Sequence, residues 1–259
     1  MYPVLFEVGG FPIRTFGLMV ALAIVLAAGI GYYMARGTKY QKHVIDMLFL
    51  AIVCALVGAR VWHVFFFQWD YYQHHLGEII AIWNGGIAIQ GGLVGGFFGA
   101  GIYCWRHKLN FWDFADLMAP AIIFGMGIGR IGCFLTAGDF GKPTGEEFGI
   151  IYPQGTVAYE TYGDQPLWPA RLWEGQMDFI IFGILMMMAN RRWPRGFMFL
   201  SYNVMYSVGR FFLAYLRGDS SPVLFGLKAS QLTSIAVVIA SIVVFLFLLA
   251  KPKYRTDEA

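Results

Sequence analysis

The amino-acid sequence predicts an all-α polytopic membrane protein with about seven transmembrane helices and a small external cap. Three observations support this prediction. Only 14% of the 259 residues are charged and 58% are hydrophobic, whereas a soluble globular domain has roughly 25% charged residues. The apolar segments approach or exceed the roughly 20 residues that a membrane-crossing helix needs. Basic residues gather in every second loop between these segments.

Seven apolar segments are candidates for the membrane-spanning helices. Each is interrupted by few charged residues and bounded by polar or charged ones. We expect one transmembrane domain that covers residues 1–259. The segments are approximately 16–35, 44–66, 86–105, 115–134, 172–189, 196–216 and 227–249.

The charge of the loops predicts the orientation of the chain. Basic residues follow the first, third, fifth and last segments, whereas the loops after the second, fourth and sixth are acidic or nearly neutral. Cytoplasmic loops carry an excess of Lys and Arg. We therefore expect the N-terminus outside and the C-terminus in the cytoplasm. The residues concerned are Arg36, Lys39, Lys42, Arg106, Lys108, Arg191, Arg192, Arg195, Lys251, Lys253 and Arg255.

The connection over residues 135–171 is too long for a simple turn. It holds four prolines and five acidic residues and falls on the external side in this topology. Long connections are usually functional or disordered. Alternating residues at 149–153 and 156–160 predict a small β-hairpin within an external cap.

Glycines recur with a spacing of four in the third predicted span, at Gly91, Gly95 and Gly99. Small residues at this spacing let membrane helices approach closely. We interpret them chiefly as a packing face. Making room for a lipid or for a backbone near a site is the alternative.

Four arginines lie within or at the ends of the predicted spans, where a charge is costly and marks a functional site by default. Arg60, Arg130, Arg210 and Arg217 all fall in the outer halves of their spans. For Arg217, at a span end, extension of the side chain to the membrane interface is an equally good interpretation.

Few carboxylates are available to pair with these arginines. Glu174 and Asp178 begin the fifth span, and Asp139 and Asp219 lie just outside the spans. A surplus of guanidinium groups over carboxylates predicts a site for an external anion. Arginine binds phosphate through a bidentate fork, so a phospholipid headgroup is the ligand we expect.

The sequence around Arg130 also carries a family motif. Residues 129–135 read Gly-Arg-Ile-Gly-Cys-Phe-Leu, which resembles the Gly-Arg-Ile/Leu-Gly-Asn-Phe signature of the prolipoprotein diacylglyceryl transferase family. Further matches keep the family's order from about residue 11 to residue 245. They are Phe16-Gly17-Leu18-Met19, Gly58-Ala59-Arg60, Trp83-Asn84-Gly85-Gly86, Gly91-Gly92-Leu93, Pro169 with Leu172 and Glu174, Gly209-Arg210-Phe211 through Arg217-Gly218-Asp219, and Ser230-Gln231-Leu232.

The resemblance implies an activity and its site. Such enzymes transfer the diacylglyceryl group of phosphatidylglycerol to the lipobox cysteine thiol of a preprolipoprotein in the bacterial inner membrane, and glycerol phosphate leaves. It implies that Arg130 and Arg210 are catalytic and stabilise the charge that grows on the phosphate. Membrane lipids and preprolipoprotein signal peptides are the implied partners, with no nucleic acid, no metal and no organic cofactor. The implied substrate-binding residues are Arg60, Arg217, Gln90, Gly132, Glu174, Asp139 and Phe16.

The sequence departs from the family at several of these positions. The family histidine before Gly-Gly-Leu is Gln90, and the carboxylate four residues after Arg210 is Ala214. The obvious candidates for a general base are therefore absent. Further departures are Phe16 for tyrosine, Cys133 for asparagine, and Trp168, Arg171 and Trp173 for histidine, glutamine and tyrosine.

Three interpretations of these departures stay open. The first is a divergent transferase that activates the thiol electrostatically, with help from Glu174 or Asp139. The second is a non-catalytic paralogue that binds phospholipid or lipoprotein signal segments. The third is a small-solute transporter, which is less favoured because the sequence has no inverted repeat and no matching pair of broken helices.

Overall fold

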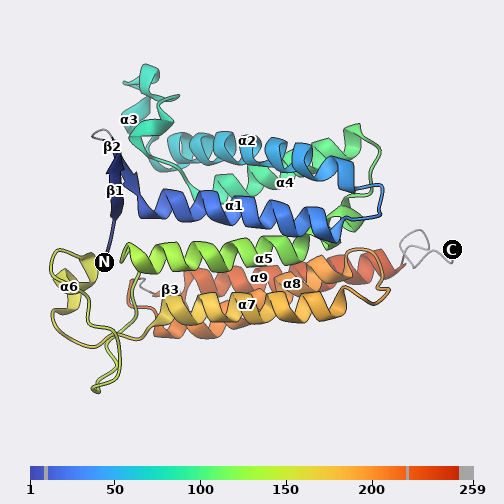
Figure 1. Cartoon of the computed structure of the whole chain (residues 1–259). Helices are drawn as coiled ribbons and strands as arrows, with labels where there is room; N and C mark the ends of the chain where they lie inside the picture. The colour runs from blue at the N-terminus through green and yellow to red at the C-terminus, as the bar shows by residue number, and fades with distance from the viewer. Residues whose placement is uncertain (9–10, 220–221, 251–259) are drawn as a thin grey trace. The chain divides into compact units, whose positions relative to one another are not determined.

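The computed structural model describes residues 1–8, 11–219 and 222–250, and most of these residues are helical (Figure 1). The chain divides into two compact units. The first unit comprises Met1–Gly31 and Ala115–Ala259, and the second comprises Tyr32–Phe114.

Each of the seven apolar segments corresponds to a long helix, with ends within a few residues of those predicted. Four helical segments are long and apolar enough to cross a membrane, namely Thr15–Met34, Gln41–Phe67, Phe111–Leu135 and Ala229–Ala250. The prediction of a polytopic helical membrane protein is therefore confirmed, whereas seven spans remain a prediction. The helices are α1 (Thr15–Met34), α2 (Val44–Trp62, continued by the π-helical turn His63–Phe67), α4 (Ile89–Arg106), α5 (Phe111–Leu135), α7 (Ala170–Met188), α8 (Phe197–Leu213, continued by the 3-10 turn Ala214–Leu216) and α9 (Ala229–Ala250).

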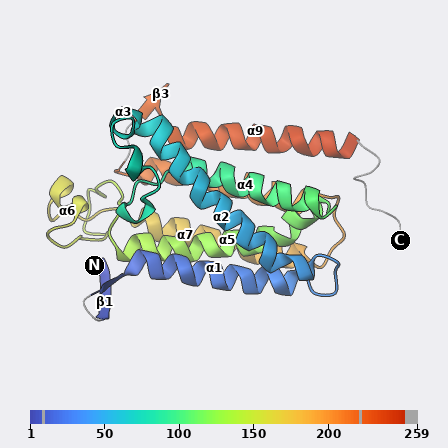
Figure 2. The same cartoon turned by 90° about the horizontal axis from the view of Figure 1, so that it is seen from above.

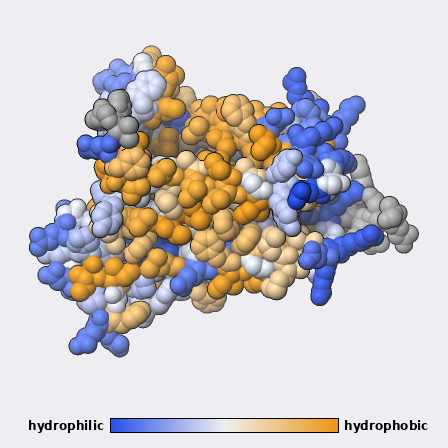
Figure 3. Space-filling view, in the orientation of Figure 1, coloured by the Kyte–Doolittle hydropathy of each residue, from blue (hydrophilic) through white to orange (hydrophobic). Residues whose placement is uncertain are grey.

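Hydrophobic side chains are spread over the surface of the helices. On the face shown in Figure 3 they cover the middle of the helices, and hydrophilic residues gather towards the helix ends. Phe49, Phe98 and Leu246 expose 70%, 62% and 60% of their surface. Such exposure is unfavourable in water and is expected where lipid is the solvent.

Within the second unit, α2 packs closely on α4 through the glycine face that the sequence predicts. A Cβ at Gly91 would lie 2.1 Å from the carbonyl oxygen of Gly58, and one at Gly95 would lie 2.2 Å from that of Cys54. The packing interpretation of these glycines is therefore confirmed. A short 3-10 helix, Gln41–His43, precedes α2. The connection between α2 and α4 contains three short helices, Trp69–Tyr72 (α3), Leu76–Glu78 and Ile82–Asn84.

Within the first unit, α7 runs beside α5 in both views, and α8 packs against both α7 and α9 (Figures 1 and 2). Their core holds Ala119 and Ile123 of α5, Ile181 and Leu185 of α7, and Tyr202 of α8. Asp116 of α5 accepts hydrogen bonds from the amides of Gly196 and Phe199 at 2.7 and 2.8 Å. This carboxylate therefore caps the N-terminus of α8 and complements its dipole.

Two short antiparallel hairpins accompany the helices and were not predicted. Strands β1 (Val4–Val8) and β2 (Phe11–Arg14) precede α1, and β3 (Pro222–Leu224) and β4 (Leu227–Lys228) precede α9. The second hairpin ends at Lys228, directly before α9.

The prediction of a β-hairpin in the cap over residues 135–171 is wrong. Residues 157–162 form a helix, α6 (Val157–Tyr162), because the Thr156 hydroxyl accepts a hydrogen bond from the amide of Tyr159 at 3.3 Å and caps the first turn. Ala158 of this helix is fully buried against Phe140 and Leu167. Isolated bridges join Leu167 to Ile150 and to Pro143.

Candidate active site

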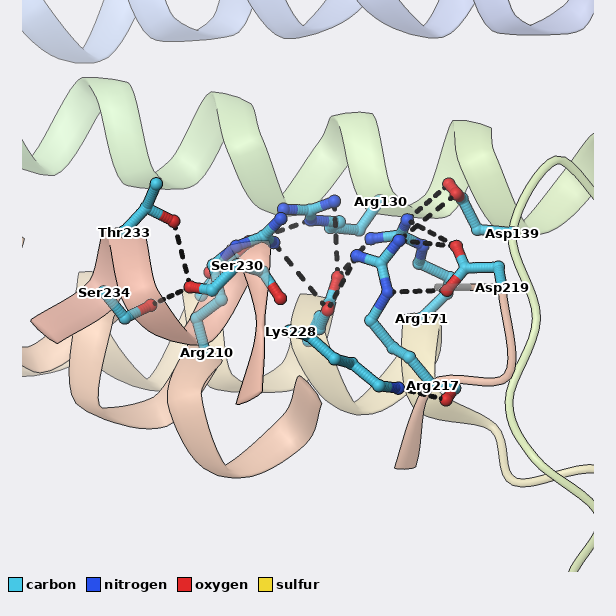
Figure 4. A network of polar contacts seen from close by, with 12 residues as sticks. Arg130, Asp139, Arg171, Arg210, Arg217, Asp219, Lys228, Ser230, Thr233 and Ser234 are labelled. Atoms are coloured by element: carbon cyan, nitrogen blue, oxygen red, sulfur yellow. Dashed lines mark hydrogen bonds and ion pairs between the residues drawn. The ribbon is translucent and has the colours of Figure 1, made fainter. Parts of the chain in front are cut away.

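A cluster of eight charged side chains lies within the first unit, at the end where α7 begins and where α5 and α8 end. Figure 4 shows its four arginines converging from different elements, with Asp139 and Asp219 among them. We call this group the arginine–carboxylate cluster. Its members are Arg130 of α5, Arg171, Glu174 and Asp178 of α7, Arg210 of α8, and Asp139, Arg217 and Asp219 in the connections.

Glu174 stands at the centre of the cluster and is 2% exposed. All four guanidinium groups lie within 4 Å of its carboxylate. Because charges interact strongly where water is excluded, this one carboxylate holds four cations together. The distances from its oxygens are 2.5 Å to Arg171 Nη1, 3.3 Å to Arg130 Nη1, 3.7 Å to Arg217 Nη1 and 3.8 Å to Arg210 Nη1.

Arg130 and Arg210 form the layer of the cluster that lies farther from the loops, which we call the deeper layer. The Tyr206 hydroxyl accepts hydrogen bonds from Arg130 Nη2 at 2.9 Å and Arg210 Nη1 at 3.3 Å. Asp178 lies 4.0 Å from Arg130 Nε. Within the described residues, Arg210 has an ion pair with Glu174 alone, at 3.8 Å, and its side chain is 25% exposed. Arg210 is thus the least neutralised arginine of the cluster and has donors to spare for a ligand.

Arg171 and Arg217 form the outer layer, nearer the helix ends. Arg171 Nη2 lies 2.5 Å from Asp139 and 3.9 Å from Asp219. Arg217 donates two hydrogen bonds to Asp219, at 2.8 and 2.5 Å, and lies 3.6 Å from Asp139. Burial opposes ionisation of Asp219, but the hydrogen bonds and charge of Arg217 outweigh it and lower the pKa of this carboxyl.

Contacts from β4 and from the first turn of α9 hold the outer layer in place. Lys228 is buried and its Nζ donates a hydrogen bond to the carbonyl of Arg217 at 2.6 Å. Gln231 accepts from the amide of Lys228 at 2.9 Å and donates to the carbonyl of Phe211 at 3.3 Å. These bonds tie the start of α9 to the end of α8, so the backbone that carries Arg217 is fixed.

Comparison with known proteins identifies the family. The family model described as prolipoprotein diacylglyceryl transferase matches residues 3–247. The chain belongs to the prolipoprotein diacylglyceryl transferase family. It is similar to proteins named phosphatidylglycerol–prolipoprotein diacylglyceryl transferase from Listeria monocytogenes serotype 4a (34% identity; 99% of this chain and 94% of the relative), Symbiobacterium thermophilum (31%; 99% and 96%) and Staphylococcus epidermidis (34%; 95% and 88%).

This family member brings together five of the residues that the sequence analysis singled out. The cluster holds Arg130, Arg210, Arg217, Glu174 and Asp139. The expected surplus of guanidinium groups is wrong, however. Arg171, Asp178 and Asp219 also belong to the cluster, so four arginines share four carboxyl groups.

The other singled-out residues make none of the cluster's ion pairs or hydrogen bonds within the described residues. Arg60, in the second unit, donates hydrogen bonds of 2.6–2.8 Å to the backbone carbonyls of Glu78, Ile79, Gly85 and Gly86. These four hydrogen bonds therefore hold the connection between α2 and α4 in place around the guanidinium group of Arg60. The remaining three are Gln90, exposed on α4, Phe16, 47% exposed on α1, and Gly132, where a Cβ would meet Met19 at 2.9 Å.

Sequence reasoning missed the part that Arg171, Tyr206 and Lys228 take in this arrangement. A signal was present for two of them. Arg171 precedes Glu174 by three residues and Tyr206 precedes Arg210 by four, so each pair shares a helical face. Nothing in the local sequence links Lys228 to Arg217.

Proposed function

We propose that this chain transfers the diacylglyceryl group of phosphatidylglycerol to the lipobox cysteine thiol of a preprolipoprotein. The single observation that carries the proposal is the deeper layer of the cluster, where Arg130 and Arg210 meet at the Tyr206 hydroxyl and Arg210 lacks a close carboxylate. Two adjacent guanidinium groups with spare donors match the oxygens of a phosphodiester. Membership of the family and the relatives' names support the same activity.

The proposed reaction is a displacement at carbon. The thiol sulfur forms a bond to the terminal glyceryl carbon of the diacylglyceryl group, and the bond from that carbon to the phosphate oxygen breaks. The electron pair of that bond stays on the oxygen, so glycerol phosphate leaves with one more negative charge. Arg130 and Arg210 stabilise this growing charge. Removal of one such donor typically costs about 10²–10³ in rate.

Activation of the thiol is electrostatic in this proposal. Gln90 and Ala214 occupy the positions of the family's histidine and carboxylate. Glu174 is surrounded by guanidinium groups, which makes it a poor proton acceptor. A free thiol with a pKa of about 8.5 is a few per cent thiolate at neutral pH. The cationic groups favour that thiolate, and its proton passes to water or to the leaving phosphate.

The proposed membrane arrangement follows from the loop charges. Seven spans, including α4, α7 and α8, place the N-terminus outside and the C-terminus in the cytoplasm of a bacterial inner membrane. Residues 1–259 then form one transmembrane domain and residues 135–171 an external insert that covers the cluster. The bilayer supplies phosphatidylglycerol and the signal peptide, and the proposed substrate-binding residues include Phe16 and Gly132 of the first unit and Arg60 and Gln90 of the second.

A mass measurement tests the proposed activity. The purified protein, in detergent with phosphatidylglycerol, is incubated with a lipobox peptide, and the peptide is followed by mass spectrometry. We expect a mass gain of one diacylglyceryl group with the parent protein and none with Arg130→Ala. A stable protein that binds the lipid without any mass gain would instead identify a non-catalytic paralogue, for which Gln90 and Ala214 would be the reason.

A further inference from the structure

The outer layer of the cluster is an anion-binding arrangement that the proposed chemistry does not use. Arg171 and Arg217 both contact Asp139, at 2.5 and 3.6 Å, so a carboxylate already sits where another anion could be held. Arg171 is 95% buried, and its Nε has no hydrogen-bond partner among the described residues. A buried guanidinium donor without an acceptor is costly, and a ligand oxygen would satisfy it.

Asp139 is the carboxylate that this arrangement can most easily release. Its side chain is 28% exposed, compared with 13% for Asp219 and 2% for Glu174. It belongs to the connection after α5 and not to a helix. If it moves away, Arg171 keeps Glu174 at 2.5 Å and Arg217 keeps its two hydrogen bonds to Asp219. The two guanidinium groups therefore stay paired with carboxylates. The net charge of the outer layer rises by one when the Asp139 carboxylate leaves it.

The proposed reaction produces an anion of the kind that two arginines bind. Its small product, glycerol phosphate, is a phosphate monoester with a second pKa of about 6, so it is mostly a dianion at neutral pH. Arg217 follows Arg210 by seven residues and lies just beyond the 3-10 turn that ends α8. The outer layer therefore lies on the loop side of the deeper arginines.

We propose that Arg171 and Arg217 form a second anion subsite, which accepts a small phosphate monoester when Asp139 moves out of it. The assignment of that monoester to released glycerol phosphate rests on the proposed function. The anion subsite itself does not. Arg171 stands where the family motif that this sequence resembles has a glutamine.

Titration of glycerol 1-phosphate into the purified protein in detergent tests the subsite. Asp139→Asn removes the competing carboxylate, so we expect binding at least about fivefold tighter than in the parent protein, the effect of one ion pair of roughly 1 kcal/mol. Glu147→Gln is the matched control, because Glu147 is an exposed acid of the same insert. It removes the same charge and should leave the affinity unchanged.

A double variant locates the effect on the outer layer. In Asp139→Asn combined with Arg171→Gln, we expect the gain in affinity to vanish, since the guanidinium that receives the anion is gone. Melting temperatures of all variants establish that they are folded. Equal affinity in Asp139→Asn and the parent protein would overturn the proposal, as would a gain that persists in the double variant.

A lipid arm separates the product from the headgroup of the substrate. Phosphatidylglycerol in mixed micelles should bind the parent protein and Asp139→Asn alike, because the deeper layer holds its phosphodiester. A gain for the lipid alone would overturn the assignment to a monoester. A gain for glycerol phosphate in a protein without transferase activity would refute the proposed function and leave the anion subsite standing.

Discussion

Arg130 and Arg210 lie on different helices, yet both donate a hydrogen bond to the same phenolic oxygen, that of Tyr206, at 2.9 and 3.3 Å. One hydroxyl thus sets the separation of two like charges. Their repulsion is offset by Glu174, 3.3 and 3.8 Å away. The deeper layer is consequently arranged before a ligand arrives, which is the condition under which fixed charges stabilise a transition state well.

Replacement of Tyr206 with phenylalanine should slow transfer without loss of folding. The change removes the hydrogen-bond acceptor that both guanidinium groups share, so their positions relative to each other are less well fixed. We expect kcat to fall by about tenfold, equivalent to roughly 1.4 kcal/mol. Tyr202→Phe is the matched control, because Tyr202 lies one turn earlier on α8 and contacts Met126 instead. An equal fall in both variants would show that Tyr206 matters only for packing.

Glu174→Gln should reduce both stability and transfer. It leaves four guanidinium groups without their common counter-charge, and breaking a buried ion pair costs about 3–5 kcal/mol. We expect a clear drop in melting temperature and at least tenfold slower transfer. Glu160→Gln in the exposed face of α6 serves as the control. Normal transfer in Glu174→Gln would remove this residue from the account.

The ion pair of Arg217 and Asp219 predicts a pH dependence of stability. Because the folded protein lowers the pKa of Asp219, the pair stabilises the fold above the unfolded pKa of about 3.9, and this contribution is lost as the pH falls through the lower folded value. Thermal unfolding of the parent protein and Asp219→Asn should therefore differ by a constant amount from pH 8 to about pH 5. The difference should shrink below about pH 4. A difference that grows on acidification would contradict the assignment.

The close approach of α2 and α4 predicts a sharp contrast between two glycines. Gly58→Ala should destabilise the protein by about 1–3 kcal/mol, because the added Cβ would lie 2.4 Å from the carbonyl oxygen of Gly91. Gly101→Ala in α4 should be neutral or slightly stabilising, because nothing lies within 4 Å of its Cβ. Thermal unfolding in detergent checks both. Equal melting temperatures for the two variants would refute the packing argument.

The long helices could be predicted from the sequence because hydropathy and length are properties of each segment alone. The cap could not be predicted in this way, because the N-cap hydrogen bond of Thr156 and the burial of Ala158 favour a helix over a strand. For the site, the conspicuous membrane arginines and their motifs drew attention to Arg130 and Arg210. The role of Arg171 depends on Asp139 and Asp219, which come from distant segments, so only the folded chain reveals it.

The most direct test of the central claim is the single-turnover rate of diacylglyceryl transfer in Arg210→Ala at saturating phosphatidylglycerol, with lipid binding measured in parallel. We predict a rate at least about a hundredfold below that of the parent protein, because the least neutralised guanidinium of the deeper layer is lost. A parental rate in a folded, lipid-bound Arg210→Ala variant would show that this layer does not stabilise the departing phosphate, and the account would be wrong.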